Sequence, residues 1–121
     1  MRLEAFAYGE PSTCSYRSRI ADLVSARNET KHSTRIPAGK EFGFMLVPSF
    51  GFQVAVMNLS FHPAAGSDYI AAVRCDYADH SCRSVILEKK LDGSVEKVEN
   101  VTRRKNNIWA INDRNYCLND W

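Results

Sequence analysis

The chain has 121 residues, of which 45% are hydrophobic and 25% are charged, and its formal net charge is +2. These values are ordinary for a globular protein and suit a single domain, residues 1–121, with one core. The longest apolar runs are far shorter than the ~20 residues that a membrane helix needs, so we expect no membrane partner. The small net charge neither requires nor excludes an acidic partner such as RNA.

Residues 1–27 are predicted to form a short strand and then the one helix of the chain. Apolar residues at alternate positions favour an arm or edge strand within 1–11. Over residues 14–27, apolar residues recur at i, i+4, i+7 and i+8, which places them on one face of a helix. This stripe consists of Tyr16, Ile20, Leu23 and Val24.

The middle of the chain is predicted to be β-structure. A polar loop over 28–41 leads into a short strand over 42–47, which Pro48 ends. Residues 50–61 are largely apolar on both faces, as expected for a central strand that is covered on both sides over its first half. Residues 68–77 form the next predicted strand, because apolar side chains again alternate with others.

Residues 83–101 are predicted to form a β-hairpin that turns at Asp92-Gly93, a dipeptide that suits a two-residue type I′ turn. Folding the chain there places two pairs of opposite charge directly across the hairpin, and both agree on one register. The predicted pairs are Leu91 with Ser94, Lys90 with Val95, Lys89 with Glu96, Glu88 with Lys97 and Leu87 with Val98.

The last predicted elements are a polar turn over 102–107 and a strand over 108–112. The elements together predict an α+β fold, in which one N-terminal helix packs on one face of a twisted antiparallel sheet. We expect disulfides to staple this fold, and we expect a monomer.

The four cysteines allow three disulfide connectivities, of which we expect Cys14 with Cys117 and Cys75 with Cys82. The first bridge joins the termini, and the second closes a short loop between adjacent strands. A zinc site is disfavoured, because the C-x6-C spacing is not that of zinc knuckles and no histidine lies beside Cys14 or Cys117. The sequence therefore predicts a secreted, disulfide-bonded protein without a metal or cofactor.

Three N-x-S/T sequons, at Asn28, Asn58 and Asn100, favour a eukaryotic secretory route. Asn58 and Asn100 lie in predicted strands, which argues against the use of all three. The first ten residues lack the apolar stretch of a signal peptide, so we expect Met1 to stand where a signal has been removed.

Two groups of residues are candidates for binding. The densest positive charge is Arg103-Arg104-Lys105, and a nucleic-acid site there would use an aromatic platform such as Trp109. The alternative is a solvated basic turn, since charge runs usually belong to the surface. The second group is the disulfide-closed loop that contains Asp76, Tyr77, Asp79 and His80. A rigid loop of this kind can plug a partner's cleft, or it can be an ordinary stapled turn.

The order of a cysteine, one helix, an antiparallel sheet and a late cysteine resembles the small secreted fungal ribonucleases of the T1/F1 type. It is more similar still to the RNase-like secreted effectors, the candidate avirulence proteins, of powdery mildew fungi. The residues that carry this resemblance are Cys14 with 14–27, the strand 83–90 with Asp92-Gly93, and Cys117. The resemblance implies action inside the host plant, on RNA or on host proteins, and recognition by immune receptors.

The resemblance also implies a ribonuclease-like fold without catalytic activity. Ribonucleases of this type pair a carboxylate base with an arginine and a histidine on neighbouring strands. The strand 50–61 contains no Asp or Glu, the strand 95–101 contains no His, and Arg83 would therefore stand alone. We expect a secreted pseudoenzyme that is translocated into host cells and binds host proteins or RNA.

Two alternatives belong to other functional classes. The first is a bacterial periplasmic inhibitor or immunity protein, since the loop between Cys75 and Cys82 is similar to the inhibitory loop of lysozyme inhibitors. The second is an active ribonuclease. It would combine His62 or His80 with Asp68 or Glu88.

Overall fold

The computed structural model describes residues 2–24, 35–76, 78–79, 81–107, 114 and 116–117. All the regular elements in these ranges are strands, so the predicted α+β fold is wrong and the described chain is all-β. The strands are β1 (Arg2–Glu10), β2 (Ser15–Val24), β3 (Phe42–Phe50), β4 (Gln53–Val54), β5 (Met57–Phe61), β6 (Asp68–Asp76), β7 (Ser81–Lys89), β8 (Val95–Lys97) and β9 (Thr102–Arg104).

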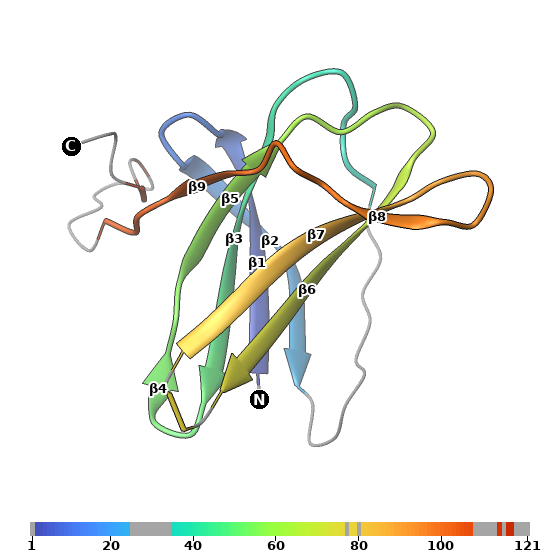
Figure 1. Ribbon diagram of the computed structural model, residues 1–121. Coiled ribbons are helices and arrows are strands. Elements are labelled where there is room, and N and C mark those ends of the chain that lie inside the picture. Colours follow the sequence, from blue (N-terminus) through green and yellow to red (C-terminus); the bar gives the residue numbers. More distant parts are fainter. Residues whose placement is uncertain are drawn as a thin grey trace.

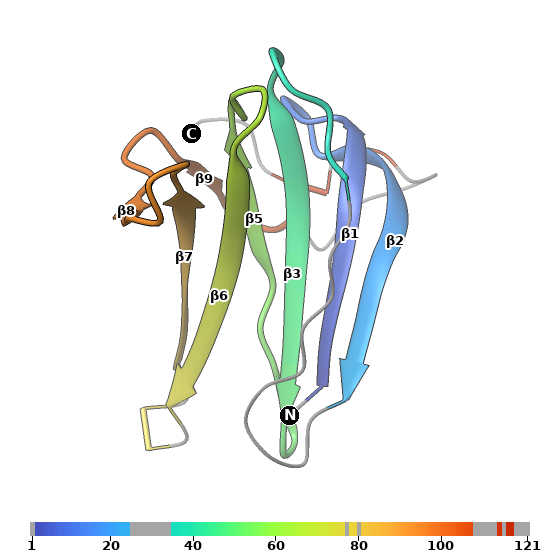
Figure 2. The ribbon, with the colours of Figure 1, turned by 90° about the vertical axis from the view of Figure 1, so that its right-hand side faces the viewer.

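The strands form two antiparallel sheets that face one another (Figures 1 and 2). The larger sheet has the order β2-β1-β3-β5-β9, with β4 paired to β3, and the smaller sheet has the order β6-β7-β8. The chain crosses to the smaller sheet after β5 and returns after β8 to pair β9 with β5. The architecture is therefore a sandwich, in which each sheet buries one face.

The core lies between the sheets, on alternate residues of the central strands. Phe42, Phe44 and Leu46 of β3 share one face and pack with Leu59 and Phe61 of β5. The smaller sheet contributes Ile86, with Tyr69 and Val73 partly buried around it. The ring of Phe61 contacts that of Phe44 edge-on, with the ring centroids 6.3 Å apart and an interplanar angle of 83°.

The predicted helix over 14–27 is wrong because its residues form β2 as far as Val24, and 25–27 lie outside the described residues. The β1–β2 pairing shifts between Ala5 and Phe6, so Ile20 is an extra residue on β2. Such a β-bulge interrupts the alternation of a strand. Ile20 and Ala21 consequently both pack against the core, and the apolar spacing mimics that of a helix.

Polar side chains of β1 and β2 form cross-strand ion pairs. Arg2 donates to Asp22 at 2.8 Å, and Arg19 donates to Glu4 at 2.7 Å. The hydrogen bond from Arg2 is the main reason that the pKa of Asp22 is lowered. The strand expected within 1–11 is present, but it lies between β2 and β3 rather than at the edge.

The segment 50–61 is not one long strand, and its first half is the exposed half. The chain turns at Gly51, whose φ is 59°, and the side chain of Phe52 is fully exposed. Only β5 is central and buried, between β3 and β9. Pro48 does not end β3, because it pairs with Leu3 and its carbonyl accepts a hydrogen bond from the Ala55 N–H.

The β7–β8 hairpin turns where predicted, with a different loop. The Gly93 N–H donates to the Lys90 carbonyl, the Lys90 N–H donates to the Ser94 carbonyl, and Gly93 has a φ of 88°. The loop therefore has three residues, 91–93, and resembles a type I turn followed by a left-handed residue. Asp92 stabilises it by accepting hydrogen bonds from the Ser94 hydroxyl and N–H, which lower the pKa of this carboxyl.

The extra loop residue moves the hairpin register by one position. Leu87 faces Lys97, Glu88 faces Glu96 and Lys89 faces Val95. The two predicted ion pairs are consequently wrong. One diagonal ion pair takes their place, between Lys90 and Glu96 at 3.0 Å, and it raises the pKa of Lys90.

Both expected disulfides, Cys14–Cys117 and Cys75–Cys82, are present. The first packs on the outer face of the larger sheet with Tyr8 and Met45. The predicted turn over 102–107 instead contains β9, because backbone pairing with β5 does not require apolar side chains. The predicted strand over 108–112 lies outside the described residues.

Candidate binding surfaces

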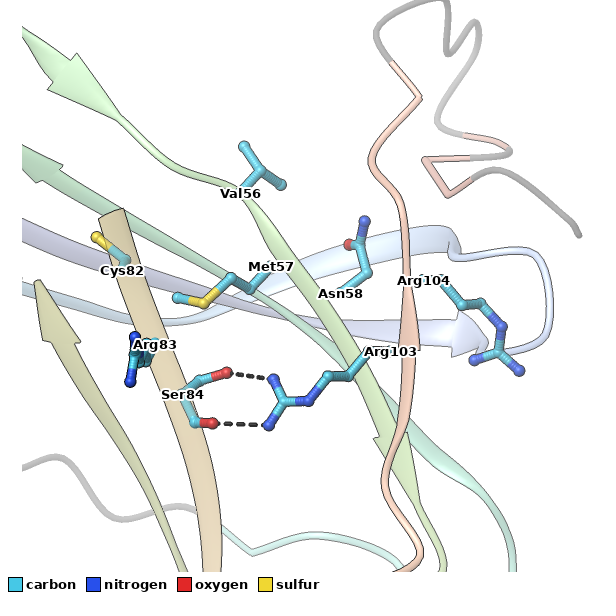
Figure 3. A pocket seen from close by; sticks show the side chains of 8 residues that line it. All are labelled: Val56, Met57, Asn58, Cys82, Arg83, Ser84, Arg103 and Arg104. Carbon is cyan, nitrogen blue, oxygen red and sulfur yellow. Dashed lines mark hydrogen bonds between the residues drawn. The ribbon is translucent and has the colours of Figure 1, made fainter. Parts of the chain in front are cut away.

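A hollow of about 400 Å³ opens between the two sheets at the edge formed by β5, β7 and β9 (Figure 3). Its lining residues are Val56, Met57, Asn58, Cys82, Arg83, Ser84, Arg103 and Arg104. Arg103 extends from β9 toward Ser84 of β7 and crosses the open edge (Figure 3). The guanidinium donates to the Ser84 hydroxyl at 2.8 Å and to the Ser84 carbonyl at 2.7 Å.

The predicted basic cluster is divided by the alternation of β9. Arg103 pairs with Leu59 and points between the sheets, whereas Arg104 pairs with Asn58 and lies on the opposite face. The Arg104 guanidinium donates to Ser60 at 2.8 Å and to Glu41 at 3.3 Å. Both arginines therefore hold parts of the sandwich together. Lys105 is exposed, and Trp109 lies outside the described residues.

Replacing Arg103 with alanine is expected to lower the free energy of unfolding by about 1 kcal/mol, because two charge-assisted hydrogen bonds between the sheets are lost at an exposed site. Guanidinium unfolding of the Arg103→Ala variant measures this loss. Lys105→Ala is the matched control, since it removes a neighbouring exposed cation, and it is expected to change stability by less than about 0.5 kcal/mol. Equal effects of the two substitutions would contradict the bridging role of Arg103.

The outer face of the smaller sheet is a second candidate surface, here called the basic face. Tyr69, Val73 and Ile86 turn toward the core, so the intervening residues of β6 and β7 point outward. The described chain provides no third layer over this face (Figure 2). Its apolar members are Ile70, Ala72, Val85, Leu87 and Val95, and its cations are Arg74, Arg83, Lys89 and Lys97.

Ile70, Ala72, Val85 and Leu87 lie in the middle of the basic face, whereas Val95 lies opposite Lys89 at one end of it. None of the five apolar members is buried. Ile70 is 48% exposed and Val95 is 51% exposed. The carboxylates of the face, Asp68 and Asp76, stand at the two ends of β6. Asp76 is already engaged, because it accepts hydrogen bonds from the Ala78 and Asp79 N–H groups.

Arg74 and Arg83 stand directly opposite one another on neighbouring strands. Neither guanidinium forms an ion pair or hydrogen bond within the described part of the chain. Like charges in directly opposed positions destabilise a sheet, by a few tenths of a kcal/mol up to about 1 kcal/mol. The sheet thus retains an arrangement that costs stability at its surface.

The predicted contact loop lies at the end of the smaller sheet. Asp76 and Asp79 are exposed there, whereas Tyr77 and His80 lie outside the described residues. Asp76 acts as the acceptor of an Asx turn that begins the loop. The exposed Phe52 marks the β3–β4 turn at the same end of the sandwich (Figure 1).

The outer face of the larger sheet is polar yet buried around Asn58. The Tyr8 hydroxyl donates to the Asn58 side-chain oxygen at 2.7 Å, and the Asn58 amide nitrogen has no hydrogen-bond partner among the described residues. The Arg17 guanidinium lies 4.7 Å from the ring centroid of Phe6 and 4.4 Å from that of Tyr116. These side chains cover the outer face of the larger sheet around Asn58, so this part of the face is shielded from solvent.

The arrangement offers little for catalysis among the described residues. No group of three or more His, Cys, Asp or Glu side chains there can hold a metal ion. His62 is exposed, and Asp68 and Glu88 point to opposite faces of the smaller sheet. Glu88 accepts a hydrogen bond from the Tyr69 hydroxyl at 3.2 Å. None of the described segments is a helix that is long and apolar enough to cross a membrane.

Comparisons of the chain with models of protein families, with curated proteins and with solved structures found no match. The two disulfides indicate a secreted or extracellular protein. The predicted site residues that the structure describes do not meet in one place, and sequence reasoning missed the basic face. A signal for that face existed, because the Cys75–Cys82 bridge sets the β6–β7 register and places Arg74 opposite Arg83.

Proposed function

We propose that this chain is a secreted recognition protein that binds an acidic partner protein through the basic face. The observation that carries the proposal is the pair Arg74 and Arg83, opposed across two strands without a carboxylate partner in the described chain. Exposed apolar side chains, Ile70 and Val95, lie farther along the same face, and their burial against a partner is favourable. Charge complementarity then selects a partner whose carboxylates surround an apolar residue.

A protein partner accounts for the basic face better than a nucleic acid does. Single-stranded nucleic acids bind to aromatic platforms beside cations, and the outward positions of β6, β7 and β8 contain no aromatic residue. The arginines first assigned to RNA, Arg103 and Arg104, donate to residues of this chain. Lys105 is the member of that group that forms no side-chain hydrogen bond or ion pair within the described residues.

The fold contradicts the architecture that the effector hypothesis assumed, but it does not test the role. The ribonuclease-like architecture is wrong, because the described N-terminal region is a strand pair and not a helix. The role that this hypothesis named, a secreted protein that acts on a host protein, agrees with the present proposal and stays a prediction. Translocation into host cells, immune recognition and inhibition through the 75–82 loop also stay predictions.

The charge reversal Arg74→Glu is expected to separate binding from stability. Binding of an acidic partner falls about tenfold, corresponding to about 1.4 kcal/mol, because an attractive charge becomes repulsive. Stability is expected to rise by a few tenths of a kcal/mol, since the introduced carboxylate would oppose Arg83 in place of a like charge. Thermal unfolding and a binding titration on the same preparation measure both effects.

A display library of random peptides provides a defined probe for this test. The proposal predicts that peptides selected by the unchanged protein carry acidic residues around an apolar one, and that binding weakens as salt rises. Arg35→Glu is the matched control, because it makes the same charge change at an exposed position outside the sheets. Selected peptides without net negative charge, or equal binding by Arg74→Glu, would contradict the proposal. Binding of total RNA in place of peptide would move the function to nucleic acid.

A further inference from the structure

The two described N-x-S/T sequons lie in opposite environments. Asn58 is 2% exposed, and its side-chain oxygen accepts the hydrogen bond from Tyr8. Ser60, the third residue of that sequon, is 1% exposed and bonds to Arg104. A sugar attached to Asn58 has no space in this fold, so glycosylation there is incompatible with the native sandwich.

Asn100 is not in a strand, contrary to the sequence-based prediction. It lies in the connection between β8 and β9, which crosses from the smaller sheet to the larger one at one end of the sandwich (Figure 1). The side chains of Asn100 and Thr102 are exposed, and neither forms a side-chain hydrogen bond within the described residues. Thr102 pairs with Ser60 through the backbone alone, so its hydroxyl is free to face solvent.

We propose that Asn100 is an acceptor for an N-linked glycan. The observations are an accessible amide, an accessible hydroxyl two residues later, and a disulfide-bonded chain of the secreted type. Val101 between them is not a proline, as the sequon requires.

The modification is a group transfer from a lipid-linked oligosaccharide diphosphate. The side-chain nitrogen of Asn100 forms a bond to the anomeric carbon of the first sugar. The bond from that carbon to the diphosphate oxygen breaks, the lipid diphosphate leaves with the electron pair, and the amide gives up one proton. No oxidant or reductant takes part.

The experiment uses the full chain secreted from cultured eukaryotic cells, with Asn28→Gln present so that the third sequon does not contribute. Treatment with peptide N-glycosidase in heavy-oxygen water converts each glycosylated asparagine to labelled aspartate, which mass spectrometry locates. Label is expected at Asn100 and not at Asn58. Secreted material without label at Asn100, or with label at Asn58, would overturn the proposal.

Variants at Thr102 test the same inference without touching the asparagine. Thr102→Ala is expected to abolish the glycan completely, whereas Thr102→Ser keeps it, because serine also completes the sequon. Both substitutions are at an exposed side chain, so both proteins are expected to be secreted with their two disulfides. A glycan that survives in Thr102→Ala would place the modification elsewhere and contradict the assignment.

Discussion

Replacing Cys14 and Cys117 together with alanine is expected to lower the free energy of unfolding by about 4–5 kcal/mol, the largest effect of any change considered. The bridge joins residues separated by 103 positions, so its loss frees nearly the whole unfolded chain. Domains of this size are stable by about 5–15 kcal/mol in total, so the variant is expected to lose at least about a quarter of its free energy of unfolding. Guanidinium unfolding followed by circular dichroism measures the loss.

The Cys14–Cys117 bridge joins two parts of the chain that also contact each other through a backbone hydrogen bond. Cys14 ends the turn that links β1 to β2, and its carbonyl accepts a hydrogen bond from the Tyr116 N–H at 2.9 Å. Cys117 forms an isolated bridge with Asn106, just after β9. The disulfide thus fastens the C-terminal part of the chain to the turn between β1 and β2.

The second disulfide is the control. Cys75 and Cys82 are separated by only 7 positions, and the same chain-entropy relation predicts a loss of about 2.5 kcal/mol for the double alanine variant. A loss of less than about 2 kcal/mol for the Cys14–Cys117 variant would contradict its role, and so would equal losses for the two variants.

Replacing Phe44 with alanine is expected to cost about 3–5 kcal/mol, the second largest effect. Its side chain is 4% exposed, and its ring packs with the rings of Phe42 and Phe61 between the two sheets. Removal of the ring leaves a cavity between the two sheets, and the antiparallel pairing on both sides of β3 limits collapse into it.

Phe52→Ala provides the matched control, because it removes the same ring from a fully exposed turn. It is expected to change the free energy of unfolding by no more than about 0.5 kcal/mol. Both phenylalanines lie in segments that the sequence predicts to be apolar strands. Only the folded structure shows that one is buried and the other exposed. Comparable losses for the two substitutions would show that β3 is not the centre of the core.

Much of the β-structure could be read from the sequence, and the failures have local causes. The apolar residues at alternate positions, Tyr69, Ala71, Val73 and Cys75, identified β6, and the cysteine spacing predicted both disulfides. The helix was wrong because a bulge at Ile20 puts two neighbouring residues on the core side, which no single-strand pattern reveals. The hairpin register was wrong because the Asp92-Gly93 dipeptide suits both two- and three-residue loops.

The candidate sites were harder to predict, because binding surfaces depend on which residues share a face. Arg103 and Arg104 are adjacent in sequence, which suggests one basic patch. In a strand, however, neighbouring side chains point to opposite faces of the sheet. Arg74 and Arg83 are separated in sequence by a loop, so no local sequence pattern groups them. Their pairing follows from the Cys75–Cys82 bridge, so this part of the site could have been predicted from the sequence.

A nuclear magnetic resonance titration of the labelled, oxidised chain with the selected acidic peptide tests whether the basic face is the binding surface. If it is, the largest shift changes fall on amides of β6, β7 and β8, including Arg74 and Arg83. These changes are also expected to shrink in the Arg74→Glu variant. Shift changes concentrated around Arg103–Lys105, or in the loop between Cys75 and Cys82, would contradict this role of the basic face.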